Sequence, residues 1–215
     1  MAAGREGGIK WQAWACRAVV IAAGAGVLAA VPASGAGASA SGTVTTIDVP
    51  GATSTTVNGV SDSGEIVGQY RDSTGIVHGF ADQAGTFTTI DDPSGGSTNA
   101  LGVRKSGEIV GSYTTSSADL GFADQGGTFT TIAVPGAAAT SATGVNDHGL
   151  IVGWYAVSPT TTVFHGFADQ GGTITTIDVP GASSTTATGV GDRGQIVGWY
   201  VNATGEHGFE VSPAA

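Results

Sequence analysis

Short runs of Val, Ile, Thr and aromatic residues alternate with turn residues along most of the chain. One block of this pattern occurs four times, starting near residues 42, 85, 127 and 172, so the spacings are 43, 42 and 45 residues. In the first block the apolar runs read TVTTIDV, TTVNGV, EIVGQY and VHGFAD. Runs of this kind, bounded by turn residues, are typical of β-strands. The pattern therefore predicts an all-β repeat protein with four strands in each repeat.

A short turn separates the second and third runs of each block. It reads SDSG, RKSG, NDHG and GDRG, and it ends at Gly64, Gly107, Gly149 and Gly194. Glycine at this place in a hairpin predicts a backbone with positive φ. We expect Asp62, Asp147 and Asp192 to cap these turns through their own backbone. Calcium ligation is the alternative, and Lys105 at the matching place in the second copy disfavours it.

A period of this length with four strands is typical of a β-propeller blade. The ADQGGTF link is tight and predicts a hairpin, whereas DVPGASSTTA is longer and predicts a crossing between sheets. Each blade then starts at a run such as TTVNGV and ends at the next copy's TFTTI. We therefore expect a four-bladed β-propeller of four-stranded antiparallel sheets, spanning 41–215 as one domain.

If each blade starts and ends at these runs, the fourth blade has only three strands. The first predicted strand, Thr43–Val49, then belongs to no sheet. We expect Thr43–Val49 to pair antiparallel with Glu206–Val211 and so close the ring, because an open ring would expose a strand edge. The small residues of the first strand suit a narrow axis. The phenylalanines of the third strand are expected to fill the space between blades, and these are Phe80, Phe122, Phe167 and Phe209.

The first 40 residues differ from the repeats. Arg5, Lys10 and Arg17 precede an apolar run over 18–31, and a tract of small residues follows. This order predicts a secretory signal peptide over 1–40, since the run is shorter than the roughly 20 residues that cross a bilayer. Cys16 lies before the apolar run, which disfavours a lipid anchor, so the mature chain is expected to be secreted without a disulfide or a membrane attachment.

The charge of the chain narrows the class of partner. The net charge is −10, and removing residues 1–40 takes away three basic residues and one acidic residue, which leaves about −12. A surface of this charge repels nucleic acid and anionic membranes. We therefore expect no nucleic acid and no membrane as partner, and the predicted export together with the aromatic residues described below favours an extracellular carbohydrate or a cell-surface protein.

The block GVNDHGLIVGWY followed by HGFADQ resembles the HAF family of extracellular repeats, named for a His-Ala-Phe tripeptide. Here the tripeptide is HGF in three copies and LGF in the second. The resemblance covers all four copies and implies an exported repeat protein. It implies no catalytic residue, cofactor or substrate.

Aromatic residues and histidines are expected to gather on one face of the predicted ring, because second strands end there and third strands begin there. The candidate ligand-binding residues are Trp154, Tyr155, His165, Trp199, Tyr200 and His207. Recurring tyrosines and histidines also suit a repeated packing contact. Gln69 and Ser112 stand in place of the two tryptophans in the first copies, so packing does not require an indole there, and aromatic rings at an exposed rim commonly contact ligands.

The sequence offers few parts for catalysis. Glu65 and Glu108 occupy matching positions and could serve as paired carboxylates, but their GEIVG surroundings are those of ordinary turn exits. There is no nucleophile elbow, phosphate loop or zinc motif. We therefore expect no cofactor, no metal and a non-catalytic binding module. A polysaccharide hydrolase or lyase and a purely structural repeat protein are the alternatives.

Overall fold

The computed structural model describes residues 44–94, 96–160 and 162–213. These residues form 15 strands, which confirms the all-β expectation. The predicted signal peptide over 1–40, with Cys16, lies outside the described residues. Within them, no helix has the length and apolar character needed to cross a bilayer.

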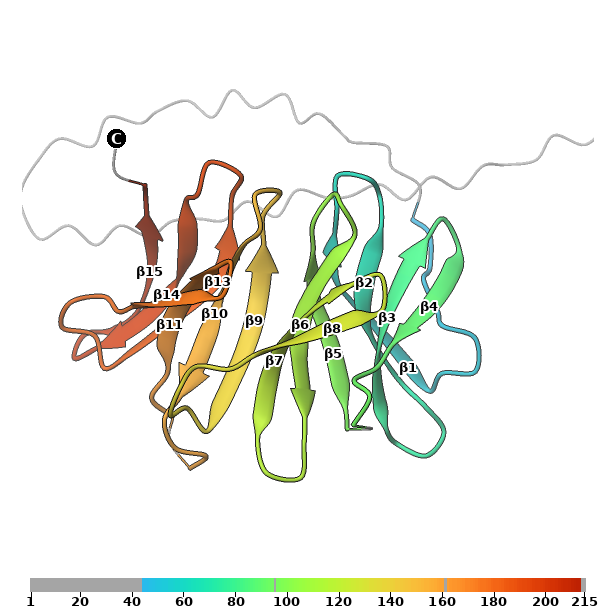
Figure 1. The fold of residues 1–215 in the computed structure, drawn as a ribbon, viewed down its shortest axis with the longest axis horizontal. Helices are drawn as coiled ribbons and strands as arrows, with labels where there is room; N and C mark the ends of the chain where they lie inside the picture. Colours follow the sequence, from blue (N-terminus) through green and yellow to red (C-terminus); the bar gives the residue numbers. More distant parts are fainter. Residues whose placement is uncertain (1–43, 95, 161, 214–215) are drawn as a thin grey trace, which may run out of the picture. The chain divides into compact units, whose positions relative to one another are not determined.

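The first sheet is an antiparallel meander of four strands, shown in cyan and green in Figure 1. Its strands are β1 (Ser54–Val60), β2 (Ile66–Arg71), β3 (Val77–Gln83) and β4 (Thr86–Ile90). The first three belong to the first copy of the sequence repeat, and β4 belongs to the second. The predicted offset between sheet and sequence repeat is confirmed here.

The second sheet has eight strands and combines two meanders. The first meander contains β5 (Thr98–Val103), β6 (Glu108–Thr114), β7 (Asp119–Gln125) and β8 (Thr128–Ile132). The second contains β9 (Ala139–Val145), β10 (Leu150–Ala156), β11 (His165–Gln170) and β12 (Thr173–Ile177). A parallel bridge from Asp119 of β7 to Ala139 of β9 joins them. The expected four-bladed β-propeller is therefore wrong, because the strands form sheets of four, eight and three rather than four separate blades.

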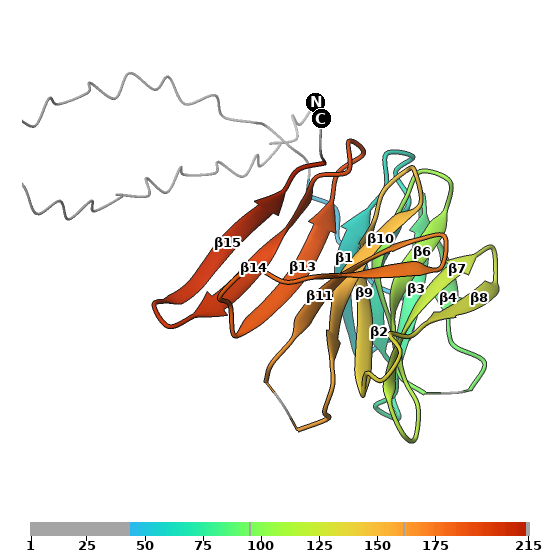
Figure 2. The ribbon, with the colours of Figure 1, turned by 60° about the vertical axis from the view of Figure 1, so that its left-hand side comes forward.

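The third sheet has three strands, and these are β13 (Ser184–Val190), β14 (Ile196–Asn202) and β15 (Gly205–Val211). Figure 2 shows β15 as its outer strand, and among the described strands β15 pairs with β14 alone. Residues 44–49 form no strand, and the Val49 amide donates to Thr55 Oγ1 of its own repeat at 3.1 Å. The predicted pairing of Thr43–Val49 with Glu206–Val211 is therefore wrong; Thr43 itself lies outside the described residues.

Apolar side chains at the two ends of the array agree with an open arrangement. On β1, Val57 is 46% exposed and Val60 is 65% exposed, and on β14 Val197 is 44% exposed. A closed ring would bury these faces. On β15, the acidic residues Glu206 and Glu210 lie on the outer strand, and charges of this kind discourage pairing of a free edge with another chain.

The core lies between successive meanders and depends on one repeated contact. Phe80, Phe122 and Phe167 are fully buried, as expected for packing residues, whereas Phe209 in the three-stranded sheet is half-buried. Each phenylalanine lies over a glycine of the second strand. A Cβ on Gly153, for example, would lie 2.8 Å from Phe167 Cε1 and closer still to the Ser141 carbonyl oxygen. The IVG and GF segments are therefore two halves of one packing contact.

The turns and crossings that hold the strands also repeat. The predicted positive φ is confirmed at the four turn glycines, with values of 81°, 80°, 75° and 82° at Gly64, Gly107, Gly149 and Gly194. Each crossing is held by a threonine six residues further on, as when Thr185 Oγ1 accepts from the Val179 amide at 3.1 Å. Thr185 is 1% exposed, so the crossing is fixed from inside the fold.

Candidate functional site

The tyrosines and histidines of the predicted face are engaged with each other. Tyr155 on β10 pairs with His165 on β11, and their rings stack with 5.1 Å between centroids. The Tyr155 hydroxyl hydrogen-bonds Thr176 Oγ1 at 3.1 Å, and His165 Nδ1 lies 2.9 Å from Asp178 Oδ2. The stack thus ties three neighbouring strands and the following crossing together.

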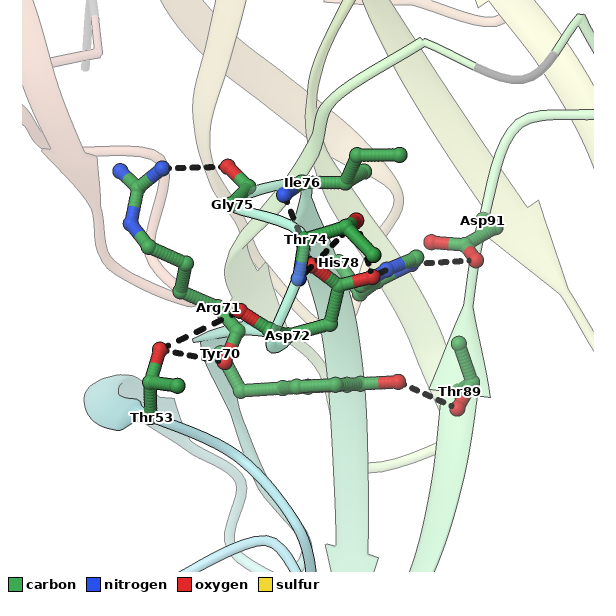
Figure 3. A network of polar contacts seen from close by, with 10 residues as sticks. All are labelled: Thr53, Tyr70, Arg71, Asp72, Thr74, Gly75, Ile76, His78, Thr89 and Asp91. Atoms are coloured by element: carbon green, nitrogen blue, oxygen red, sulfur yellow. Dashed lines mark hydrogen bonds and ion pairs between the residues drawn. The ribbon is translucent and has the colours of Figure 1, made fainter.

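The first repeat contains the same arrangement in fuller form (Figure 3). Tyr70 stacks on His78 with 5.0 Å between centroids, and His78 Nδ1 lies 2.8 Å from Asp91 Oδ2. A second carboxylate, that of Asp72, lies 3.5 Å from His78 Nε2. Burial opposes the charged imidazole, but the two carboxylates outweigh it and raise the pKa of His78 above its usual value. The side chain of Thr74 is the main donor that lowers the pKa of Asp72 to about 2.

The fourth repeat keeps the contact between tyrosine and histidine, but its rings are tilted by 34° and no carboxylate contact to the histidine is seen among the described residues. Tyr200 and His207 lie 5.2 Å apart between ring centroids, and His207 Nε2 contacts Thr204 Oγ1 at 2.9 Å. The contact therefore persists in the sheet that has three strands. A ring pair that recurs wherever both residues occur is accounted for by packing.

The two tryptophans have different surroundings. Trp154 lies on β10 of the eight-stranded sheet, opposite Gly166, and meets the ring of Phe164 edge-on at 4.9 Å between centroids. Trp199 is half-buried on β14 of the three-stranded sheet, opposite Gly208. The six predicted residues are thus divided between two sheets.

Trp154 and Phe164 line a pocket of about 430 Å³ at the point where the two meanders of the second sheet join. The loop after β6, the start of β9 and the loop after β10 form its walls. The lining residues are Thr115, Ser117, Ala118, Asp119, Ala138, Ala139, Trp154, Ala156, Ser158, Pro159 and Phe164. We call this the Trp154 pocket. It combines two aromatic rings with hydroxyl groups and the exposed carboxylate of Asp119.

Hydrogen bonds from backbone amides hold the walls of the Trp154 pocket in place. The Phe164 amide donates to Ser184 Oγ at 2.9 Å, and the Thr185 amide donates to the Phe164 carbonyl at 2.8 Å. On the opposite wall, the Thr115 amide donates to the Ala118 carbonyl at 2.8 Å and closes a tight turn. The aromatic wall is therefore anchored to β13 of the next sheet.

Sequence reasoning missed Phe164 and the opposite wall. Phe164 occupies the position of Val77 in the first repeat. It directly follows the lengthened loop of the third copy, and this extra length was the one feature of the sequence that pointed to the region. Thr115, Ser117 and Asp119 come from the preceding repeat and carried no signal, because their approach depends on the parallel bridge.

The acidic turns are also positioned by the structure. The oxygens of Asp62, Asp147 and Asp192 lie within 4.8 Å of one another, and all three residues are exposed. Asp147 Oδ1 accepts from the Lys105 amide at 2.9 Å, and Asp192 Oδ1 accepts from the Asp147 amide at 3.0 Å. Asp147 and Asp192 therefore cap the turn of a neighbouring repeat, which corrects the expectation that each caps its own.

No family model matches the chain, and no curated protein matches it either.

Proposed function

We propose that the protein is a secreted, non-catalytic repeat protein that binds extracellular carbohydrate in the Trp154 pocket. The observation that carries this proposal is the edge-on pair of Trp154 and Phe164, which presents an aromatic wall beside hydroxyl groups. Sugar rings have apolar faces that stack on aromatic rings and hydroxyl groups that exchange hydrogen bonds with Ser, Thr and Asp side chains.

The size and the acceptors of the pocket suit this class of ligand. A volume of about 430 Å³ lies within the range of small-molecule sites. Asp119 accepts hydrogen bonds only, whereas Thr115, Ser117 and Ser158 can both donate and accept. One carboxylate stands among the described lining residues, and glycoside hydrolysis uses two, so the lining supports binding without turnover.

Export is part of the same proposal. The basic and apolar order of residues 1–40 and the resemblance to HAF repeats both support an extracellular protein. An acidic surface also suits a soluble protein outside the cell, where neutral glycans are available as ligands.

A glycan array probed with the purified protein tests the proposal, followed by a reducing-end assay on each glycan that binds. We expect binding of at least one glycan class without release of reducing ends. Release of reducing ends would show an enzyme instead. An array on which nothing binds, with the protein shown folded by circular dichroism, would reject a carbohydrate ligand.

A further inference from the structure

A second pocket, which shares no lining residue with the Trp154 pocket, lies between β4 of the first sheet and the β6–β8 part of the second. Its volume is about 460 Å³. The lining residues are Glu65, Ala81, Thr88, Thr89, Ile90, Asp91, Pro93, Gly107, Ile109, Asp124, Gly126, Gly127 and Phe129. They include three carboxylates and no basic side chain. We call this the acidic pocket.

Asp124 is the most unusual residue of the acidic pocket. It is 2% exposed, and its Oδ1 has no hydrogen-bond partner among the described residues. In the matching residues of the first and third repeats this same oxygen is bonded, since Asp82 Oδ1 accepts from the Gly85 amide at 2.7 Å and Asp169 Oδ1 from the Gly172 amide at 2.8 Å. A buried carboxylate oxygen without a donor is costly, so this oxygen calls for a donor from a ligand.

A second unsatisfied oxygen lines the same pocket. Asp91 Oδ1 is buried without a hydrogen-bond partner in the described chain, while Oδ2 of the same residue contacts His78 Nδ1. Burial raises the pKa of Asp124 and outweighs the opposing amide of Gly127. Two of the carboxylates that line the acidic pocket therefore each have a buried oxygen without a hydrogen-bond partner among the described residues.

Glu65 supplies the third carboxylate and lacks the partner that its counterpart has. In the second repeat, Glu108 Oε2 lies 2.7 Å from Arg104 Nε. The position of Arg104 is Ser61 in the first repeat, so Glu65 has no cation of this kind. The Glu65 side chain reaches toward the next repeat, because a Cβ on Gly107 would lie 3.5 Å from Glu65 Oε2.

The arrangement favours an extended organic cation over a single metal ion. In the described part of the chain, the acidic residues that converge within 4.8 Å of one another are those of the exposed turns, and none of them lines this pocket. Besides the carboxylates and two threonines, the walls include the apolar side chains of Ile90, Ile109 and Phe129. An alkyl chain packs on such walls, and a cation can also lie over an aromatic ring.

We propose that the acidic pocket binds an organic cation, in which an alkylammonium or guanidinium group donates to Asp124 and Asp91 and its hydrocarbon chain lies against Ile109 and Phe129. The cation could come from a free polyamine or from a Lys or Arg side chain of a polypeptide. This site goes beyond the proposed carbohydrate function and does not depend on it.

Isothermal titration calorimetry with spermidine and with N-acetyl-lysine amide and N-acetyl-arginine amide tests the proposal. We expect saturable binding with one site for at least one probe. Binding of spermidine alone assigns a free polyamine, and binding of the capped amino acids assigns a polypeptide. Failure of all three probes to bind the native protein overturns the proposal. A parallel titration with MgCl₂ is the control, and binding of Mg²⁺ without binding of any organic cation also overturns the proposal.

Matched variants separate the acidic pocket from the general negative charge of the surface. Asp124→Asn and Glu65→Gln should each weaken binding at least tenfold, whereas Asp169→Asn, which removes the same charge at a position where Oδ1 is bonded, should leave it within about twofold. Equal weakening by Asp169→Asn would overturn the site. Glu65→Gln decides the matter if Asp124→Asn does not fold, because Glu65 is only half-buried.

Discussion

The indole of Trp154 meets the ring of Phe164 edge-on, with 4.9 Å between the centroids and 65° between the planes. Trp154 belongs to β10, and Phe164 ends the loop that connects β10 to β11. The Phe164 backbone is bonded to Ser184 and Thr185 at the start of β13. The aromatic pair is therefore held by two sheets, and the proposed ligand site has a fixed wall.

Substitution of a turn glycine tests the backbone of the repeated hairpin. Gly64 has a φ of 81°, and an added Cβ would meet no atom within 4 Å, so a side chain there adds backbone strain without a clash. We expect Gly64→Val to lower the free energy of unfolding by about 1 to 3 kcal/mol, measured by urea denaturation. An unchanged midpoint of unfolding would show that this turn does not need the left-handed backbone.

The packing of phenylalanine over glycine makes a sharper prediction. A Cβ on Gly153 would lie 2.8 Å from Phe167 Cε1, so Gly153→Ala should destabilise the protein by at least about 2 kcal/mol. Gly208→Ala is the matched control, because its Cβ would meet only the Gly198 carbonyl oxygen at 3.8 Å. We expect the control to melt within a few degrees of the native protein, and equal losses for the two variants would refute the packing contact.

The pKa of His78 predicts how pH affects the first repeat. Because its pKa is raised in the folded state above the ordinary 6.5, His78 stabilises the fold below that pH, and its contribution is lost as pH rises through the folded pKa. Asp91→Asn should lower the pKa of His78, measured by NMR titration of its imidazole Cε1 proton. Asp92→Asn is the control and should leave the titration unchanged; identical titrations in native protein and Asp91→Asn would contradict the assignment of Asp91 as partner.

Local features could be predicted from the sequence because they depend on short-range chemistry. The turn glycines were found from the turn sequence alone, and the buried phenylalanines from their period. The arrangement of the sheets depends on longer-range contacts that the period does not encode. The bridge between Asp119 and Ala139 joins two meanders into one sheet. The Val49 amide hydrogen-bonds Thr55 Oγ1 in its own repeat, and residues 44–49 form no strand beside β15.

Comparing the four copies could reveal a site residue only where its identity differs from that of its counterparts. Trp154 differs from Gln69 and Ser112 at matching positions, which made it a candidate. Asp124 has the same identity as Asp82 and Asp169, so only its surroundings distinguish it, and these come from β4 of another sheet. The lengthened loop of the third copy marks the region of Phe164, but its extra residues shift Phe164 out of line with Val77 of the first copy, so the exact residue could not be picked out.

The central claim is that carbohydrate binds at Trp154, and the most direct test is to titrate one array-positive glycan into the native protein, Trp154→Ser and Trp199→Ser by calorimetry. Serine already stands at this position as Ser112. We predict that Trp154→Ser raises the Kd at least about 30-fold, or about 2 kcal/mol, while its melting temperature stays within a few degrees. Trp199→Ser should bind within about twofold of the native protein. Unchanged affinity in a folded Trp154→Ser variant, or equal losses in the two variants, would contradict the claim.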